Sequence, residues 1–371
     1  METKIKAAVI GGSGFTGLGL LKILNNHPLV EVSFTTSKTY DGMDISEVFP
    51  SYSDKSCLYT DAEKPKNTKK LKFTVIDKMP KNELAEIDVI FLCLPPLQSM
   101  EFVNNYLLDF KGKIIDIGSD FRIKDPEGFK TWYGTEHKLK NILPGFIYGL
   151  PEIYKEKIAC SRLIANPGCY PTSIILALAP VLKDGSLMIE NINIDSKSGV
   201  TGAGRKVKPE YLFCSVNENF FAYSVLAHRH IGEIEQEIEK LANKNFKVSF
   251  TPHLLPVNRG IFTSIYCKVG NKGKEITDNN VESGKIVDSI LKSYEEFYKD
   301  SIFVKFLGQK IPQLKDVVGT NMCQIGIAFD DRTGTLKIFS AIDNLLKGAA
   351  GQAVQNMNII FGFNEAEGLV G

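Results

Sequence analysis

The first 160 residues alternate between short apolar runs and stretches in which hydrophobic residues recur at helical spacing. Four apolar runs are predicted to be buried strands: 4–10, 29–37, 85–96 and 111–122. Residues 18–27, between the first two, carry leucines and an isoleucine at helical spacing. Strands that alternate with helices are typical of a Rossmann-type α/β fold with a doubly wound parallel sheet. Ligands of such folds bind at the carboxyl ends of the strands.

Two other stretches depart from this pattern. Residues 50–72 are rich in lysine and serine, show little periodicity and are predicted to form a surface insertion. Residues 340–362 are predicted to be the end of a strand followed by a helix that is dense in Gly, Ala, Gln and Asn. A chain of 371 residues exceeds one ordinary core, so two domains are expected.

Composition narrows the class of protein. Hydrophobic residues make up 43% of the chain and charged residues 23%, as in soluble globular enzymes. The net charge of +1 favours neither nucleic acid nor a membrane surface as a partner. The seven cysteines are scattered and form no CxxC motif, which argues against a disulfide framework and for a reducing compartment. The N-terminus runs straight into a strand pattern, so we expect a cytoplasmic protein.

The turn after the first strand, GGSGFTG at 11–17, fits the glycine spacing of dinucleotide-binding turns. Such turns let a pyrophosphate approach the backbone at a helix N-terminus. The strand–turn–helix context favours this interpretation over a plain glycine turn. The residues predicted to contact the cofactor here are Gly11, Ser13, Gly14, Phe15, Thr16 and Gly17.

The end of the second strand indicates which dinucleotide is bound. Sites that prefer NAD usually carry an acid there, which binds the ribose diol. This chain has Ser37 and Lys38, and its first carboxylate is Asp41. A hydroxyl and an ammonium suit a 2′-phosphate, so NADP(H) is the predicted cofactor. The alternative is that Lys38 is only a solvated loop residue.

The stretch NPGCYPT, at 166–172, places Cys169 on a rigid turn directly before a helix. Pro171 suits the first turn of that helix, where its missing N–H costs nothing. A helix N-terminus stabilises a thiolate, and its free N–H groups can hold an oxyanion. Cys169 is therefore the predicted nucleophile, whereas the other six cysteines are interpreted as structural.

A nucleophilic thiol needs an acid/base partner, and the chain has five histidines. His228 and His230 stand just before an acidic helix. Their spacing could serve a metal, but no third ligand has suitable spacing, so no metal site is predicted. His228 is the preferred acid/base, and His230 is the alternative.

Cations near turns point to an anionic substrate. The glycine-rich stretch 196–207 offers backbone N–H groups and cations to a phosphate or carboxylate. Together with arginines in GSDFR and PVNRGI, it suggests a doubly anionic substrate. The predicted substrate-binding residues are Arg122, Ser198, Gly199, Arg205 and Arg259.

Taken together, NPGCYPT, HRHIGEIEQ, SGVTGAGR, PVNRGI and DNLLKGAAGQAVQNMN resemble the N-acetyl-gamma-glutamyl-phosphate reductase family of arginine biosynthesis. The resemblance spans nearly the whole chain. It implies a Rossmann domain over 1–165, an α+β catalytic domain over 166–340, and a C-terminal helix within 341–371 that returns to the first domain. It also implies NADPH, with Asn344 among the residues that contact it.

The chemistry that the resemblance implies is a thioester on Cys169, formed from N-acetyl-L-glutamyl 5-phosphate and reduced to the 5-semialdehyde, with His228 protonating the oxyanion. One departure from the family pattern is Pro96, where the family often has histidine. Aspartate-semialdehyde dehydrogenase and the carrier-linked aminoadipyl-phosphate reductase of lysine synthesis are alternatives, and a nucleotide-sensing binding protein is the non-enzyme alternative. A homodimer or homotetramer is expected, with a small-molecule substrate and neither nucleic acid nor membrane as partner.

Overall fold

The computed structural model describes residues 4–52, 71–78, 81–185, 187–270 and 279–371. Most of the insertion predicted at 50–72 therefore lies outside the described residues. The chain divides into two compact units. The first comprises residues 1–168, 319–321 and 345–371, and the second comprises residues 169–318 and 322–344. The domain boundaries expected at 165 and 340 remain predictions.

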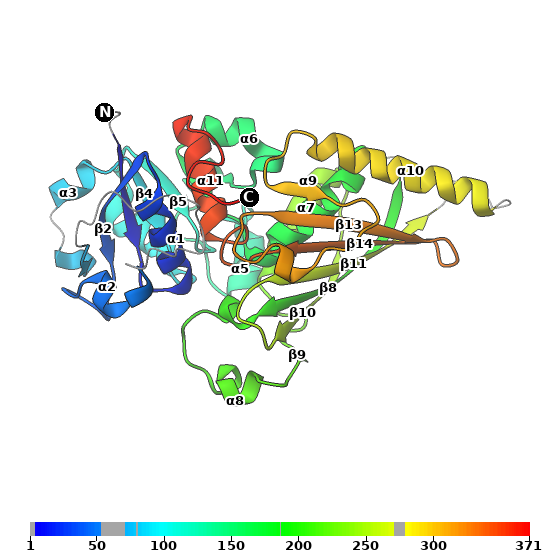
Figure 1. Ribbon diagram of the computed structural model, residues 1–371. Helices are drawn as coiled ribbons and strands as arrows, with labels where there is room; N and C mark the ends of the chain where they lie inside the picture. The colour runs from blue at the N-terminus through cyan, green and yellow to red at the C-terminus, as the bar shows by residue number, and fades with distance from the viewer. Residues whose placement is uncertain (1–3, 53–70, 79–80, 186, 271–278) are drawn as a thin grey trace. The chain divides into compact units, whose positions relative to one another are not determined.

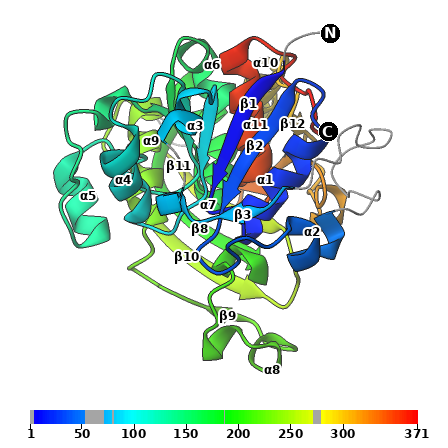
Figure 2. The same ribbon diagram turned by 90° about the vertical axis from the view of Figure 1, so that its left-hand side faces the viewer.

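The first unit is built on a seven-stranded sheet in which every pairing is parallel (Figure 1 and Figure 2). Its strand order is β3-β2-β1-β4-β5-β7-β6, which confirms the predicted doubly wound α/β class. The strands are β1 Ile5–Ile10, β2 Val30–Thr36, β3 Phe73–Thr74, β4 Val89–Leu92, β5 Lys113–Asp116, β6 Ile147–Tyr148 and β7 Leu163–Ala165. The helices are α1 Phe15–Asn26, α2 Ile45–Val48, α3 Lys81–Ala85, α4 Gln98–Phe102, α5 Pro126–Tyr133, α6 Pro151–Ala159 and α11 Ala350–Phe361.

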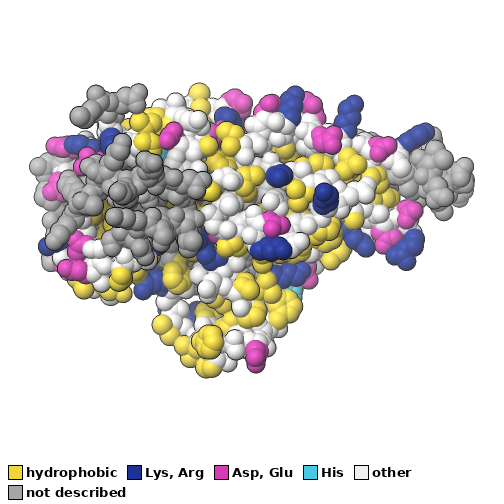
Figure 3. Space-filling model, in the orientation of Figure 1, with side chains coloured by type: hydrophobic (Ala, Val, Ile, Leu, Met, Phe, Trp, Pro, Cys, Tyr) yellow, Lys and Arg dark blue, Asp and Glu magenta, His cyan; other side chains and the backbone are white. Residues whose placement is uncertain are grey.

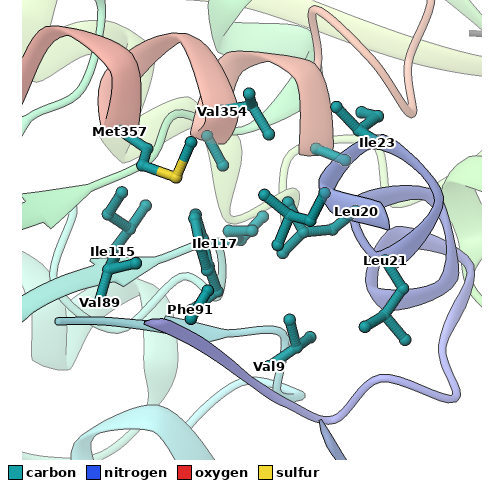
Figure 4. Packing of buried hydrophobic residues seen from close by; sticks show 14 of the residues in the cluster. Val9, Leu20, Leu21, Ile23, Val89, Phe91, Ile115, Ile117, Val354 and Met357 are labelled. Carbon is teal, nitrogen blue, oxygen red and sulfur yellow. The ribbon is translucent and has the colours of Figure 1, made fainter. Parts of the chain in front are cut away.

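The central strands of this sheet are apolar on both faces because helices cover both. On one face α1 and α11 pack together over the sheet, and Leu20, Val354 and Met357 meet Phe91 and Ile115 there (Figure 4). The helix predicted from the small-residue pattern near the C-terminus thus belongs to the core of the first unit.

The Gln and Asn side chains of α11 form hydrogen bonds with neighbouring segments of the first unit. Gln352 and Asn356 both donate to the carbonyl of Gly149, at 3.1 and 2.9 Å. Asn356 also donates to Asn166 at 3.0 Å, and Asn166 donates to the carbonyl of Ala349. A buried polar group is tolerated when it is hydrogen-bonded. This network therefore holds the segment that leads to Cys169 against α11.

An ion pair without solvent contact stands beside this network. The ammonium of Lys347, which is fully buried, lies 2.7 Å from Glu152 at the start of α6. The same ammonium donates to Gln355 of α11 at 2.7 Å. A buried ion pair is stable only when its geometry and additional hydrogen bonds offset desolvation, and Gln355 supplies such a bond. Lys347 therefore joins the start of α6 to α11.

The second unit is a mixed seven-stranded sheet with helices, as predicted for an α+β domain. Its strand order is β12-β13-β14-β11-β8-β10-β9, with β8 parallel to β10 and antiparallel to β11. The strands are β8 Met188–Gly199, β9 Phe221–Ala222, β10 Val248–Leu255, β11 Ile261–Gly270, β12 Val304–Phe306, β13 Cys323–Asp330 and β14 Thr335–Ile342. The helices are α7 Cys169–Asp184, α8 Phe213–Val216, α9 His230–Ala242 and α10 Asn279–Tyr298.

Helix α7 is the central element of this unit, and all its residues from Tyr170 to Leu182 are buried. Pro180 inside the helix has no N–H, so the carbonyl of Leu176 loses its helical partner. The Tyr298 hydroxyl of α10 donates to that carbonyl, and the Tyr294 hydroxyl donates to the neighbouring one of Ala177. The proline is therefore compensated by two tyrosines of an adjacent helix.

Candidate active site

The glycine-rich turn of the first unit connects β1 to α1 without room for side chains. A Cβ on Gly12 would lie 2.0 Å from the Thr35 hydroxyl, and one on Gly17 would lie 2.5 Å from the carbonyl of Gly11. Gly11 has a φ of +86°, which favours glycine. Gly14 precedes α1, whose first residues are Phe15 and Thr16. The turn therefore packs its backbone closely at the N-terminus of α1, and its binding of a pyrophosphate remains a prediction.

The end of β2 lies beside this turn. The Ser37 hydroxyl is 3.0 Å from that of Ser13 and accepts from the N–H groups of Thr39 and Tyr40. Ser37 is thus buried and anchored, whereas Lys38 is exposed. Lys38 therefore follows, in the chain, a serine that is held against the glycine-rich turn, and its side chain is exposed to solvent.

Beyond β5 the first unit contains a buried carboxylate pair that the sequence analysis did not single out. Asp116 and Asp120 are fully buried. Burial, together with the charge of Asp120, raises the pKa of Asp116 to about 7. Burial also raises the pKa of Asp120, against the hydrogen bonds that it accepts from Met100 and Leu97. The predicted substrate residue Arg122 neighbours this pair and lowers both pKa values.

The guanidinium of Arg122 is largely committed to the backbone. Its Nε donates to the carbonyl of Asn166 at 2.8 Å, and its Nη2 donates to that of Ile117 at 3.0 Å. The side chain is only 5% exposed. Arg122 therefore braces the chain ahead of Cys169, whatever contact it makes with substrate.

Cys169 is the first residue of helix α7 and the first residue of the second unit. Its side chain is partly exposed, in contrast to the helix that follows it. Inside that helix the Ser173 hydroxyl donates to Thr263 at 2.9 Å and contacts Ser340 at 2.5 Å, which ties α7 to two strands. The thiol therefore stands at the start of a helix whose position is fixed by the strands it contacts.

The imidazole of His228 lies in an aromatic cage beside the start of α7. The ring of Tyr170, the residue after Cys169, is 5.6 Å from the His228 ring in an edge-to-face arrangement. The rings of Tyr223 and Phe250 lie 5.7 and 5.6 Å away. The Tyr170 and Tyr223 hydroxyls are 3.0 Å apart, and Tyr170 also donates to the carbonyl of His253. The structure thus brings His228 next to the residue that adjoins the predicted nucleophile.

The cage controls the charge and the tautomer of His228. Burial lowers the pKa of His228 to about 4, with a smaller contribution from the charge of Arg229. The imidazole is therefore neutral near pH 7. Its Nδ1 accepts from the backbone N–H of His230 at 3.2 Å. In a neutral ring this hydrogen bond assigns the proton to Nε2, so His228 offers an N–H donor.

The glycine-rich loop after β8 is pinned from two sides. A Cβ on Gly199 would lie 2.7 Å from the backbone nitrogen of Arg259, so glycine is required there. The amide of Asn344, a predicted cofactor contact, accepts from Gly260 at 2.7 Å and donates to Thr201 at 3.0 Å. Asn344 is 2% exposed and holds the two loops together.

The remaining predicted substrate residues differ in their surroundings. Ser198 is buried at the end of β8 and forms a hydrogen bond that acts on the Tyr170 hydroxyl. Arg259 forms an ion pair with the fully buried Asp343, at 3.1 Å. Arg205 is exposed on the chain that leaves the loop. Ser198 therefore lies close to the His228 cage, whereas Arg259 is partly occupied by a structural partner.

Sequence reasoning missed Tyr223 and Asp116. Tyr223 stands five residues before His228 in an irregular stretch, and only the tertiary fold brings it against Tyr170. Asp116 is the last residue of the apolar strand β5. A carboxylate at the end of a buried strand is the signal by which the sequence could have revealed it.

No group of three or more His, Cys, Asp or Glu side chains in the described part of the chain is arranged to hold a metal ion. None of the helices in this part is long and apolar enough to cross a membrane.

Comparison with known proteins first defines a class. Residues 6–161 match the family model described as semialdehyde dehydrogenase, NAD binding domain. Residues 169–344 match the model described as semialdehyde dehydrogenase, dimerisation domain. Among solved structures, aspartate semialdehyde dehydrogenase II of Vibrio cholerae, complexed with ASA, has a TM-score of 0.68 at 16% identity, covering 97% of this chain and 99% of its own. The enzyme of Candida albicans, solved with NADP, has a TM-score of 0.63 at 15% identity, covering 96% and 98%. These structures establish the fold.

Curated relatives are closer in sequence. A protein of Desulfotalea psychrophila is 45% identical over 98% of both chains, and one of Alkaliphilus metalliredigens is 44% identical over 98% of both. Both are named N-acetyl-gamma-glutamyl-phosphate reductase. The chain therefore belongs to the N-acetyl-gamma-glutamyl-phosphate reductase family, a family of oxidoreductases with a domain that binds a nicotinamide dinucleotide.

The charge state of His228 gives a testable prediction. Between its ordinary pKa of 6.5 and its folded-state pKa of about 4, the unfolded chain takes up a proton that the folded protein does not. Stability is therefore lost as the pH falls through this window, by about 2 kcal/mol at pH 5 from this group. We expect His228→Asn to lose less stability between pH 7 and pH 5 than the wild type, measured by urea unfolding.

A ¹³C-histidine NMR titration provides the direct control, because the His228 resonance is identified by its disappearance in His228→Asn. Its midpoint should lie near 4. A midpoint at the ordinary 6.5 would contradict the cage as the cause.

Proposed function

We propose that this protein reduces N-acetyl-L-glutamyl 5-phosphate to N-acetyl-L-glutamate 5-semialdehyde and phosphate with NADPH, as a step of arginine biosynthesis. Membership of the N-acetyl-gamma-glutamyl-phosphate reductase family supports the substrate. The observation that carries the chemistry is the placement of Cys169 at the start of buried helix α7, with the His228 cage beside Tyr170. The protein is proposed to act in the cytoplasm as a homodimer or homotetramer.

In the proposed reaction the Cys169 thiolate attacks the acyl carbon of the substrate. A carbon–sulfur bond forms, the bond from carbon to the phosphate oxygen breaks, and phosphate leaves with the bonding electrons. The thioester is then reduced at the acyl carbon, and collapse of the resulting hemithioacetal expels the Cys169 thiolate and releases the aldehyde. Dividing the reduction into two steps is the usual gain of covalent catalysis.

His228 is proposed to stabilise the oxygen that becomes negative in both tetrahedral states. Its neutral ring offers Nε2–H as a hydrogen-bond donor. A donor that is fixed in advance lowers the cost of forming an oxyanion. The resemblance implies that His228 protonates the oxyanion. Because the ring is neutral, we propose that it instead donates a hydrogen bond from Nε2–H to that oxygen.

The cofactor is proposed to bind the first unit. The cradle of Gly11, Gly14 and Gly17, with Ser13, Phe15 and Thr16, would hold the pyrophosphate because a Cβ at the tight positions would fill it. Ser37 and Lys38 would hold the 2′-phosphate, which favours NADP(H). When bound, this group supplies the hydride for the reduction.

Substrate anions are proposed to be held near the loop after β8, with Ser198 and Gly199 contributing hydroxyl and backbone donors. Arg205 adds a cation at the exposed end of that loop. Arg122, Arg259 and Asn344 are proposed to act mainly by positioning, since the backbone, Asp343 and the two loops already engage them.

The reaction itself is tested in reverse. With N-acetyl-L-glutamate 5-semialdehyde, we expect NADP reduction that depends on added phosphate, followed by absorbance. Aspartate semialdehyde is the comparison substrate. If only aspartate semialdehyde were turned over, the protein would instead be an aspartate-semialdehyde dehydrogenase. Turnover of neither would favour a carrier-bound aminoadipyl substrate or a protein that binds nucleotide without catalysis.

Histidine variants test the assignment of His228 as the hydrogen-bond donor to the oxyanion. We expect His228→Asn to lower kcat by about 10²- to 10⁴-fold, because the donor to the oxyanion is lost or misplaced. His230→Asn is the matched control: its backbone N–H, which fixes His228, remains, so the loss should be small. A larger loss in His230→Asn than in His228→Asn would reverse the assignment.

Lys38 tests the dinucleotide preference. Replacing its ammonium by a neutral group, Lys38→Met, should raise the KM for NADPH by about tenfold, because an exposed charge-assisted contact with phosphate is worth about 1–2 kcal/mol. The KM for NADH should change little. Equal changes in the KM values for NADPH and NADH would show that Lys38 does not contact the 2′-phosphate.

A further inference from the structure

The four residues before His228, 224–227, form an irregular segment with an unusual backbone. Ser224 and Leu226 have positive φ values of 47° and 67°. Residues other than glycine keep such a conformation only where the surrounding structure fixes it. All four side chains of the segment are exposed and contribute little packing of their own. The segment must therefore be fixed at its ends, and at the far end the carbonyl of His228 accepts from Ile231 of α9 at 2.9 Å.

The chain on the other side of this segment is an arm, residues 204–222, that leaves the loop after β8 and includes α8 (Figure 1). Hydrogen bonds from Ser215 to the carbonyl of Pro209 and from Asn219 to that of Ser215 run within the arm. Its apolar side chains lie on the surface of the lower projection in the space-filling view (Figure 3). The arm returns to the body of the unit at β9, which pairs with β10 over two residues. Support for the segment therefore begins at β9 and the residue that follows it.

Tyr223 is that residue, and three contacts tie it to the body of the second unit. Its backbone N–H donates to the carbonyl of Pro252 in β10 at 3.0 Å. Its hydroxyl oxygen lies 3.0 Å from that of Tyr170 in α7. Its ring lies 5.7 Å from the imidazole ring of His228. Tyr223 thus joins a strand, the helix that begins at Cys169, and the histidine at the far end of the segment.

The surroundings of the Tyr170 hydroxyl determine the direction of the bond between the two tyrosines. This hydroxyl has one proton, which it donates to the carbonyl of His253 at 3.2 Å, because a carbonyl cannot donate. The Tyr223 hydroxyl is therefore the donor to Tyr170. Ser198, at the end of β8, also forms a hydrogen bond with the Tyr170 hydroxyl. Because Tyr170 is buried, the bond fixes Tyr223 to a side chain that the core already holds.

We propose that Tyr223 is a positioning residue whose hydroxyl bond to Tyr170 holds residues 224–227 in their strained conformation and so places the imidazole of His228 beside the start of α7. The two hydroxyls come from residues that are 53 positions apart in the sequence, so no neighbour along the chain can replace either partner. The consequence of this placement for turnover rests on the proposed function. The placement itself does not.

Tyr223→Phe tests the placement, because it removes the hydroxyl and keeps the ring. In a ¹³C-histidine NMR titration the pKa of His228, which burial lowers to about 4, should rise to about 5 as the loosened segment admits water. The charge of Arg229 and the His230 ring, 4.7 Å away, are the same in both proteins. Tyr266→Phe is the matched control, because Tyr266 is an exposed tyrosine of β11, and it should titrate like wild type. An unchanged pKa of His228 in Tyr223→Phe would overturn the proposal.

A double-mutant cycle separates the loss of this bond from a general loss of packing. Tyr170→Phe removes the other partner of the bond. Adding Tyr223→Phe to Tyr170→Phe should then change the pKa of His228 no further, because the bond is already absent. A second shift as large as that of Tyr223→Phe alone would show that the two hydroxyls act independently, and it would overturn the proposal.

Steady-state kinetics test the consequence for turnover. We expect Tyr223→Phe to lower kcat by about 10- to 100-fold, because the imidazole is misplaced, and to change the KM for the acyl phosphate by less than about twofold. A raised KM with an unchanged kcat would assign Tyr223 to substrate binding and overturn its positioning role. A wild type without activity, in which Tyr223→Phe still shifts the pKa of His228, would count against the proposed function and support the placement.

Discussion

Helix α7 begins at the predicted nucleophile, and its burial determines where that thiol can stand. Every residue from Tyr170 to Leu182 is buried, and Ser173 joins the helix to Thr263 and Ser340 in two strands. Even the helix-breaking residue Pro180 is accommodated, because Tyr298 donates to the carbonyl that it leaves unpaired. A helix fixed along its whole length cannot shift its first turn without disturbing the core. Catalytic geometry and stability of the second unit therefore depend on the same packing.

The chain before α7 is held just as firmly, within the first unit. Asn166 is bonded to α11 through Asn356 and the carbonyl of Ala349, and its own carbonyl accepts from Arg122. The ion pair of Lys347 with Glu152 joins α11 to α6. Removing one member of a buried polar network leaves its partners unsatisfied, so a change at Asn356 should disturb the segment that leads to Cys169. Within the first unit, α11 thus holds the segment that leads to Cys169.

Local sequence patterns were sufficient to predict the parts that depend on neighbours along the chain. The glycine spacing of 11–17, the apolar runs of β1 and β4 and the proline-bounded turn before α7 each express a local steric rule. The run 85–96 predicts a longer strand than β4, which spans only Val89–Leu92, because α3 ends at Ala85 and residues 86–88 form the turn between them.

Features that depend on tertiary partners were not predictable in this way. The sequence predicts that Arg259 binds a substrate anion, but its guanidinium already forms an ion pair with Asp343. Tyr223 lies beside His228 because β9, the short strand directly before it, pairs with β10. His228 is likewise neutral because it is buried among the rings of Tyr170, Tyr223 and Phe250, which are far apart in the sequence. The type of a residue therefore indicates a possible role, but the tertiary contacts of its side chain determine its charge state and its hydrogen-bond partners.

Trapping the acyl-enzyme tests the central claim, that Cys169 at the start of α7 forms a covalent thioester. Protein mixed with N-acetyl-L-glutamyl 5-phosphate in the absence of NADPH, quenched in acid and digested, would be examined by mass spectrometry. The account predicts an N-acetylglutamyl adduct on the peptide that contains Cys169, with release of about one phosphate per site, and no adduct on the exposed Cys160 or Cys214. Phosphate release only when NADPH is present, with no adduct on Cys169, would contradict it.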